Sequence, residues 1–165
     1  MKKLPLLLLL LLIPIPILLL ASSSPSHAVA ELGVGFGLVS FDDDLDGVDT
    51  DMGTTIEGTF GSGAIRLMVA MQDSSHDQGD YNAVMGGPAW VMDMGGFSTR
   101  IYALISAHEF ENIDGAGVTL GGGVGWPVFP AASLGFDVRI SRWDGGSGFK
   151  DVGTGTLQVL FRLGF

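Results

Sequence analysis

Polar and apolar residues alternate strictly at the end of the chain, in the stretch TLQVLFRLGF. Successive side chains of a β-strand point to opposite faces, so this alternation predicts a strand with one apolar face. The second face is mixed, which indicates that the two faces meet different surroundings. The apolar row consists of Leu157, Val159, Phe161, Leu163 and Phe165. The mixed row consists of Thr156, Gln158, Leu160, Arg162 and Gly164.

The same two-residue period recurs earlier in the chain, between clusters of Gly, Asp, Ser and Pro. One segment is interrupted by Gly86, Gly87 and Pro88, and the next has apolar residues on both faces. Together with the closing strand, these segments predict an all-β chain of eight antiparallel strands. The seven earlier segments cover roughly residues 31–41, 52–60, 64–72, 81–91, 97–109, 116–125 and 132–143.

Strands of this length and pattern predict a closed up-and-down β-barrel whose aliphatic rows face lipid. The opposite rows are rich in Gly and Thr and also carry most of the arginines. An arginine that faces lipid at the midplane of a bilayer costs about 2–4 kcal/mol, whereas an arginine inside a barrel can pair with a carboxylate. The predicted interior ion network consists of Glu57, Arg66, Arg100, Asp137, Arg139 and Arg162.

This network has two interpretations, a packed polar plug or a continuous ion-lined path. We favour the plug, because the interior of an eight-stranded barrel is just wide enough for side chains to fill it. Glu57 and Arg66 stand almost symmetrically about the turn at 61–63, so we expect them to be near neighbours on one face.

With an even number of strands, both ends of the barrel lie on one side of the membrane, which we expect to be the periplasm. The connections at 42–51, 73–80, 111–115 and 144–153 should then be the longer, external loops, and those at 61–63, 92–96 and 126–130 the short periplasmic turns. Aromatic residues fall near strand ends and predict two interfacial girdles. The outer girdle would contain Phe41, Tyr81, Phe110 and Trp143, and the inner one Phe60, Trp90, Phe97, Trp126 and Phe165.

The first thirty residues read as a secretory signal peptide, with a basic start, an apolar run and small residues before the cleavage site. Cleavage would leave Val29 or Glu31 as the first residue; we favour Glu31, so that residues 31–165 form the barrel domain. An uncleaved anchor is the alternative, which the prolines in the apolar run disfavour. The chain contains no cysteine, which excludes a lipoprotein acylated on Cys.

Loss of Lys2 and Lys3 would leave 18 acidic residues against six basic ones, a net charge of −12. This charge argues against a nucleic-acid partner.

Three features resemble known membrane proteins. The closing strand that ends in Phe resembles the C-terminal signal that the barrel-insertion machinery of bacterial outer membranes reads. The stretches IYALISAHEF, DGAGVTLGGGVGWPV and SLGFDVRISRW resemble the small YfaZ-like outer-membrane proteins. The overall plan is similar to the OmpA and OmpX membrane domains. These resemblances imply an outer-membrane location and contact with outer-membrane lipids and lipopolysaccharide, and they bring no catalytic motif.

The stretch DDDLDGVDTD carries six carboxylates in ten residues. Asp42, Asp44 and Asp46 match the first ligands of an EF-hand-like calcium loop, and Asp49 and Asp51 add further carboxylates. The twelfth position, where a bidentate Glu should close the shell, is glycine. We therefore favour a solvated acidic loop over a specific calcium site, and expect no cofactor beyond weakly bound Ca²⁺.

The stretch DSSHD gathers Ser74, Ser75 and His76 where an external loop is expected. Barrel enzymes that modify lipid A place such residues near the outer rim, but no spacing here matches a catalytic motif. We therefore expect no enzyme activity, and expect His108 to donate or accept hydrogen bonds in the interior.

The sequence thus predicts an integral outer-membrane β-barrel with a structural or surface-exposed role and a plugged polar lumen. The alternatives are a narrow porin-like channel, a lipid A-modifying enzyme, and a soluble periplasmic barrel that holds an apolar ligand inside.

Overall fold

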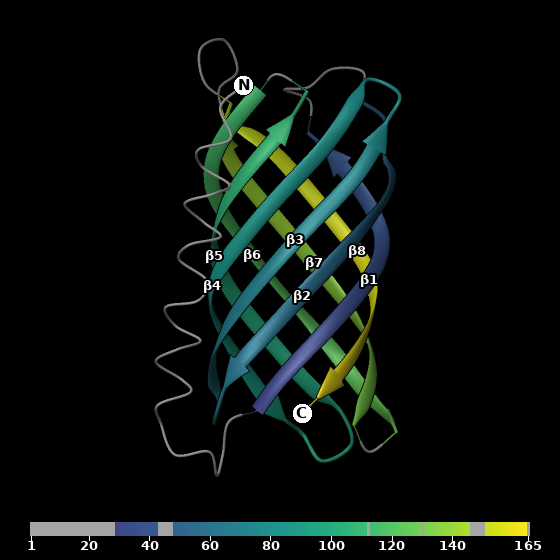
Figure 1. Ribbon diagram of the computed structural model, residues 1–165, viewed down its shortest axis with the longest axis vertical. Coiled ribbons are helices and arrows are strands. Elements are labelled where there is room, and N and C mark those ends of the chain that lie inside the picture. The colour runs from purple at the N-terminus through teal and green to yellow at the C-terminus, as the bar shows by residue number, and fades with distance from the viewer. Residues whose placement is uncertain (1–28, 43–47, 112, 130, 146–150, 165) are drawn as a thin grey trace.

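A computed structural model describes residues 29–42, 48–111, 113–129, 131–145 and 151–164. The predicted signal peptide, apart from Val29 and Ala30, lies outside the described residues. The described chain forms eight antiparallel strands that close into one barrel, as predicted (Figure 1). The strands are β1 (Val29–Phe41), β2 (Asp51–Gly61), β3 (Ile65–His76), β4 (Gly79–Asp93), β5 (Ser98–Phe110), β6 (Ile113–Phe129), β7 (Ala132–Asp144) and β8 (Val152–Gly164).

The barrel closes because β1 pairs with both β2 and β8. Val34, for example, lies between Ile56 of β2 and Phe161 of β8. The strand neighbours follow the chain order, so the topology is an up-and-down meander with no open sheet edge. β1 begins and β8 ends at the same end of the barrel, which we call the terminal end, and the opposite end is the loop end (Figure 1). Within the described part of the chain, no helix is long and apolar enough to cross a bilayer.

The predicted assignment of faces is confirmed. Aliphatic side chains such as Ile105, Leu120 and Ile140 lie exposed on the outside, at 77%, 59% and 61% of their full accessibility. Their strand neighbours on the other face are buried in the lumen, and many are polar, including Thr119, Arg139 and Ser141. The barrel is therefore apolar outside and largely polar inside, the reverse of a soluble barrel that encloses an apolar ligand.

Inward-facing glycines make room for the large side chains of the lumen. A methyl group on Gly121 would stand 2.5 Å from the ring of Tyr102, and one on Gly33 would stand 2.8 Å from Cγ of Glu57. A methyl on Gly117 would meet Cβ of Trp143 at 2.6 Å. The narrow interior thus holds bulky and charged side chains only because glycine stands opposite them.

Two of the predicted external loops are wrong. β3 continues to His76 and β4 begins at Gly79, and the two pair fully up to the turn, with Ser74 opposite Tyr81. β5 and β6 likewise pair up to Phe110 and Ile113. The alternation predicts shorter strands because the outward side chains become polar near this end. The pairing between the strands nevertheless continues. The connections at 42–50 and 145–151 remain as the longer loops at this end.

The predicted turn at 126–130 is also wrong, because β6 continues to Phe129 with a register irregularity between Pro127 and Phe129. The interrupted fourth segment forms one continuous strand, β4, through Gly86, Gly87 and Pro88. A methyl group on Gly87 would stand 2.6 Å from the carbonyl oxygen of Ala103, so glycine allows a close approach to β5 at this point.

The predicted outer aromatic girdle is wrong. Tyr81, Phe110 and Trp143 are almost fully buried, and Phe41 packs against them inside the barrel. Their positions follow from the rule that alternate residues of a strand share a face. Trp143, for example, lies on the same face as Arg139 and Ser141. At the terminal end, Trp90, Phe97 and Trp126 are exposed and Phe60 is partly exposed, as a girdle there requires. Phe165 lies outside the described residues.

Candidate functional site in the barrel interior

The terminal half of the lumen contains a charged layer that consists of Glu57, Arg100, Asp137, Arg139 and Arg162. Oε2 of Glu57, on β2, accepts hydrogen bonds from Nη2 of Arg100 at 2.9 Å and from Nη2 of Arg139 at 2.7 Å. Its other oxygen accepts one from Nε of Arg162 at 3.0 Å. These arginines come from β5, β7 and β8, so Glu57 links β2 to three strands that are not its neighbours in the sheet.

Asp137 of β7 is the second centre of the charged layer. Its Oδ2 accepts from Nε and Nη2 of Arg100 at 3.2 and 3.0 Å. Its Oδ1 accepts from Nε of Arg139 at 3.1 Å, from Nε2 of Gln158 at 3.2 Å, and from the hydroxyl of Tyr102. Charge-assisted bonds of this number compensate much of the cost of burying a carboxylate.

The charged layer carries more positive than negative charge. Three guanidinium groups face the two carboxylates of Glu57 and Asp137. Nη1 of Arg100, Nη1 of Arg139 and Nη2 of Arg162 are buried and make no hydrogen bond to any residue that the structure describes. Nη1 of Arg100 does contact Oε1 of Glu57 at 2.7 Å, but not in hydrogen-bond geometry. The layer therefore has one excess positive charge and unused donors.

Arg66 does not join the charged layer, contrary to the prediction. Ala70, not Arg66, lies opposite Glu57 in the hairpin of β2 and β3. Nη1 of Arg66 instead pairs with Oε1 of Glu31 at 3.2 Å, and its Nε donates to the carbonyl of Gly63. The predicted neighbour relation fails because the hairpin turns between Gly61 and Ile65, which shifts the register. The other five residues of the predicted network lie together.

The loop half of the lumen contains an aromatic layer that consists of Phe41, His76, Tyr81, His108, Phe110 and Trp143. His108 stacks on the indole of Trp143, with ring centres 5.1 Å apart and an angle of 11°. The ring centre of Phe41 lies 5.1–5.2 Å from the ring centres of His76, Tyr81 and Phe110. Met68, Met85, Leu104 and Leu160 are also fully buried in the lumen.

Each histidine of the aromatic layer bonds a serine two residues earlier on its strand. Nε2 of His76 lies 2.8 Å from Oγ of Ser74, and Nε2 of His108 lies 2.8 Å from Oγ of Ser106. Nδ1 of His76 donates to the carbonyl of Asp49 at 2.9 Å, so Nε2 accepts the hydroxyl proton of Ser74. Nδ1 of His108 bonds the hydroxyl of Tyr81 at 2.8 Å. As predicted for His108, these groups satisfy one another inside the barrel.

Successive residues of β3 point to opposite faces, which separates Ser75 from Ser74 and His76. Ser74 and His76 point into the lumen and are buried, whereas Ser75 faces outward and its hydroxyl donates to Asp80 at 2.9 Å. The bonding partner of Nδ1 of His76 is a backbone carbonyl where a hydrolase would place a carboxylate. The arrangement is that of a buried polar pair on one strand face.

The acidic loop is described only in part, since residues 43–47 lie outside the described residues and with them Asp44 and Asp46. Oδ2 of Asp42 pairs with Nη1 of Arg142 at 2.6 Å. Asp49 lies just before β2, and Asp51 is the first residue of that strand. In the described part of the chain, no three acidic, His or Cys side chains gather as metal ligands. The preference for a solvated acidic loop over a specific calcium site therefore remains a prediction.

The residues of the proposed insertion signal line the outer surface of β8. Leu157, Val159, Phe161 and Leu163 are exposed in one row, while Thr156, Gln158 and Leu160 are buried on the other face. Phe165 lies outside the described residues.

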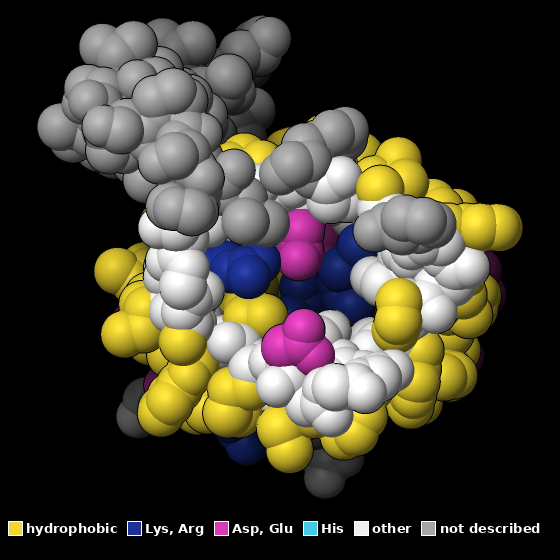
Figure 2. Space-filling model, turned by 90° about the horizontal axis from the view of Figure 1, so that it is seen from below, with side chains coloured by type: hydrophobic (Ala, Val, Ile, Leu, Met, Phe, Trp, Pro, Cys, Tyr) yellow, Lys and Arg dark blue, Asp and Glu magenta, His cyan; other side chains and the backbone are white. Residues whose placement is uncertain are grey.

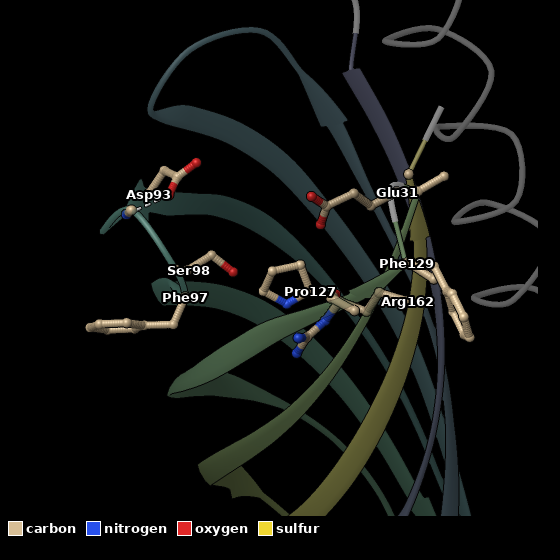
Figure 3. A pocket seen from close by; sticks show the side chains of 13 residues that line it. Glu31, Asp93, Phe97, Ser98, Pro127, Phe129 and Arg162 are labelled. Carbon is tan, nitrogen blue, oxygen red and sulfur yellow. Dashed lines mark hydrogen bonds between the residues drawn. The ribbon is translucent and has the colours of Figure 1, made fainter.

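A vestibule opens at the terminal end of the lumen. Its volume is about 620 Å³, and Glu31, Asp93, Ser98, Ser133 and Arg162 are its polar lining residues. Figure 2, a view into this end, shows basic side chains at the bottom of the opening and hydrophobic side chains around the outside. In Figure 3 the side chains of Glu31, Ser98 and Arg162 point into the space, whereas Phe97 and Phe129 point away from it.

Sequence reasoning missed four residues of the lumen and its vestibule. Tyr102 and Gln158 both bond Asp137, and their inward position could have been found from strand parity. Glu31 of β1 pairs with Arg66 of β3, and Asp93 is one of the residues that line the vestibule. No sequence signal marks these last two, because their roles depend on register and strand length.

No known protein family and no curated protein matches the sequence. The fold is similar to Neisserial surface protein A, with 14% identity, a TM-score of 0.60, and coverage of 85% of this chain and 98% of that one. It is similar to Ail of Yersinia pestis, at 14% identity, a TM-score of 0.54, and coverage of 84% and 99%; that structure contains the heparin analogue sucrose octasulfate.

The N-terminal β-barrel domain of OprF from Pseudomonas aeruginosa is similar as well, at 12% identity, a TM-score of 0.53, and coverage of 83% and 98%. At these identities the likeness concerns the fold alone. The chain has the eight-stranded, closed antiparallel fold of small outer-membrane β-barrels.

Proposed function

We propose that the protein is an integral β-barrel of the bacterial outer membrane with a closed lumen and a structural or surface-exposed role. The observation that carries this proposal is the continuous belt of exposed aliphatic side chains around the barrel. Leu38, Ile56, Met71, Leu120 and Val138 are about half exposed or more on five different strands. A belt of this size in water would be an aggregation surface, whereas in a bilayer it meets hydrocarbon.

Polar residues bound this belt at the loop end and aromatic residues bound it at the terminal end. Outward carboxylates at the loop end include those of Asp73, Asp80, Glu109, Asp114 and Asp144. Glu109 lies directly opposite Asp114 in the sheet, an arrangement that water and counter-ions must screen. The acidic loop end thus lies outside hydrocarbon, and we assign it to the cell exterior, where lipopolysaccharide surrounds it.

The two side-chain layers support a closed lumen. The charged layer joins β2, β5, β7 and β8 across the interior, and the aromatic layer joins β1, β3, β4, β5 and β7. Stacked rings and saturated carboxylates leave their positions only at a large cost in contacts. We therefore favour a plug over a porin-like channel.

The buried position of Ser74 and His76 argues against lipid A chemistry, because the belt and the lipids lie on the other face of β3. The row on β8 that ends near the terminal rim supports recognition by the barrel-insertion machinery. Membership of the YfaZ-like group rests on the glycine-rich stretch of β6 and the following Trp126 and Pro127.

Membrane fractionation combined with gel migration tests the proposal. Expressed in a Gram-negative host, the protein should stay with the outer membranes and migrate differently before and after boiling. Reconstituted in planar bilayers, it should give no current steps. Recovery in the soluble periplasmic fraction would contradict the membrane assignment, and regular current steps would contradict the closed lumen.

Enzyme activity has a separate test. The Ser74→Ala and His76→Gln variants should leave the mass pattern of host lipid A the same as the wild-type protein does. A mass change made by the wild type and lost in both variants would establish lipid A chemistry.

A further inference from the structure

The excess positive charge of the charged layer lies beside a cavity that opens to water. A small cavity of about 20 Å³ adjoins the vestibule and shares Glu31, Ser98, Ser133 and Arg162 with it. Arg100 and Gly125 also line the small cavity. A volume of this size holds one water molecule or one oxygen of a larger group. The cavity thus connects the arginines of the charged layer to the vestibule.

Two donors approach Gly125 at the wall of the small cavity. A point at the place of a methyl group on Gly125 lies 3.1 Å from Nη1 of Arg162 and 3.2 Å from Oγ of Ser98. The carbonyl oxygen of Leu134 is farther away, at 3.9 Å. That point is one bond length from Cα of Gly125, so no ligand atom can stand on it; the absence of a side chain instead lets the guanidinium and hydroxyl donors come close to β6 where they line the small cavity.

Arg162 is the buried donor of the two, and it is incompletely used. Arg162 is 6% exposed, and its Nη2 makes no hydrogen bond within the described chain. Its Nε is held by Glu57, which fixes the direction of the guanidinium group. Arg162 shares Glu57 and Asp137 with Arg100 and Arg139, and burial of three guanidinium groups with two carboxylates costs free energy that an anion at Arg162 would offset.

We propose that the floor of the vestibule binds one oxyanion group, a carboxylate or a phosphate, of a water-soluble solute. Arg162 and Ser98, which both line the small cavity beside Gly125, are the donors, and Arg100 adds positive charge from the same cavity. The vestibule, at about 620 Å³, has room for the rest of the solute. The carboxylates of Glu31 and Asp93 stand at the rim, and Arg66 neutralises that of Glu31.

This site depends on the geometry of the lumen and not on the membrane location. A barrel with no anion site would still fractionate with outer membranes and change its migration on boiling. The two proposals therefore fail separately.

Calorimetric titration tests the site on the folded barrel in non-ionic detergent at constant ionic strength, with inorganic phosphate and acetate as probes. At least one probe should bind saturably to the wild type. Arg162→Gln should weaken that binding about tenfold or more, the loss expected for a charge-assisted hydrogen bond. Arg162→Gln leaves two arginines facing two carboxylates, so the layer stays balanced and the barrel should fold.

Gly125→Ala provides a second variant that changes no charge. Its methyl group would occupy the position between Arg162 and Ser98, so it should also weaken binding about tenfold. The matched controls lie at the other end of the barrel: Gly155→Ala, where a methyl would meet only Oγ of Ser40, at 3.1 Å, and Arg142→Gln. Both controls should bind as the wild type does.

Absence of saturable binding in the folded wild type would overturn the proposal, as would equal binding by wild type and both vestibule variants. A lipid phosphate is a rival source of the oxyanion, so the titration is repeated in discs that contain phosphatidylglycerol. Unchanged affinity supports a solute from water. Loss of phosphate binding in these discs would show that the lipid headgroup occupies the site.

Discussion

Glu57 on β2 and Arg139 on β7 meet inside the barrel, where Nη2 of Arg139 donates to Oε2 of Glu57 at 2.7 Å. The two strands are not neighbours in the sheet, so this ion pair reaches across the lumen. Arg100 and Arg162 bind the same carboxylate. One glutamate therefore holds three arginines that come from three other strands.

Replacement of Glu57 should be among the most destabilising changes in the lumen. Glu57→Gln leaves three arginines facing only Asp137, and loss of one member of a buried pair costs about 3–5 kcal/mol. Arg162→Gln restores the charge balance, so it should cost clearly less. Urea unfolding of the barrel in lipid vesicles measures both. Equal losses for the two variants would show that charge balance does not control the stability of this layer.

The fit between Gly121 and Tyr102 can be tested by a double-mutant cycle. Gly121→Ala places a methyl 2.5 Å from the Tyr102 ring and should destabilise the barrel by about 1–3 kcal/mol. Tyr102→Val removes the ring, so Gly121→Ala should cost much less in that background. Unfolding free energies of the four proteins give the coupling. Strict additivity would mean that the ring and the glycine are not in contact.

A charge on the belt should report on the solvent around the barrel. Val138 lies at the middle of β7 and is 49% exposed. In a bilayer, Val138→Arg should destabilise the protein by about 2–4 kcal/mol. Asn82→Arg, on the outward face near the acidic loop end, should change stability by less than about 0.5 kcal/mol. A barrel surrounded by water would tolerate both changes equally well.

Calcium titration tests the acidic loop. We expect the same small heats from the wild type and from a variant with Asp42, Asp44 and Asp46 replaced by Asn, because Asp42 is already paired with Arg142. Calorimetry in a chelator-treated sample provides the measurement. A saturable signal in the wild type that disappears in the triple variant would establish a calcium site.

Much of the fold could be predicted from the sequence because the two faces of each strand meet different solvents. Leu134, Phe136 and Val138 alternate with Gly135 and Asp137, and this period alone gives the correct inside and outside. The loops at the loop end are harder to predict. There the outward face of β3 carries Asp73 and Ser75, so both faces are polar and the alternation disappears although the strand continues.

The errors about the site have a common physical cause, which is the register between strands. A turn at 61–63 predicts that Arg66 lies beside Glu57, whereas the actual register brings it to Glu31. The place of Trp143 near a strand end predicts a girdle residue, although Trp143 shares a strand face with Arg139 and Ser141 and therefore lies inside the barrel. The sequence alone shows which residues of a strand share a face, because alternate residues do. The register between strands and the contacts between distant strands depend on closure of the whole barrel.

The central claim is that the aliphatic rows face hydrocarbon while the arginines lie in a closed interior. The chain contains no cysteine, so single cysteines can be introduced along β7 from residue 134 to 141 and spin-labelled in lipid vesicles. Accessibility to oxygen, which dissolves in hydrocarbon, should be high at the even positions and low at the odd ones, while a water-soluble nickel reagent reaches neither row. High oxygen accessibility at the odd positions, or free access of nickel to the even ones, would contradict the account.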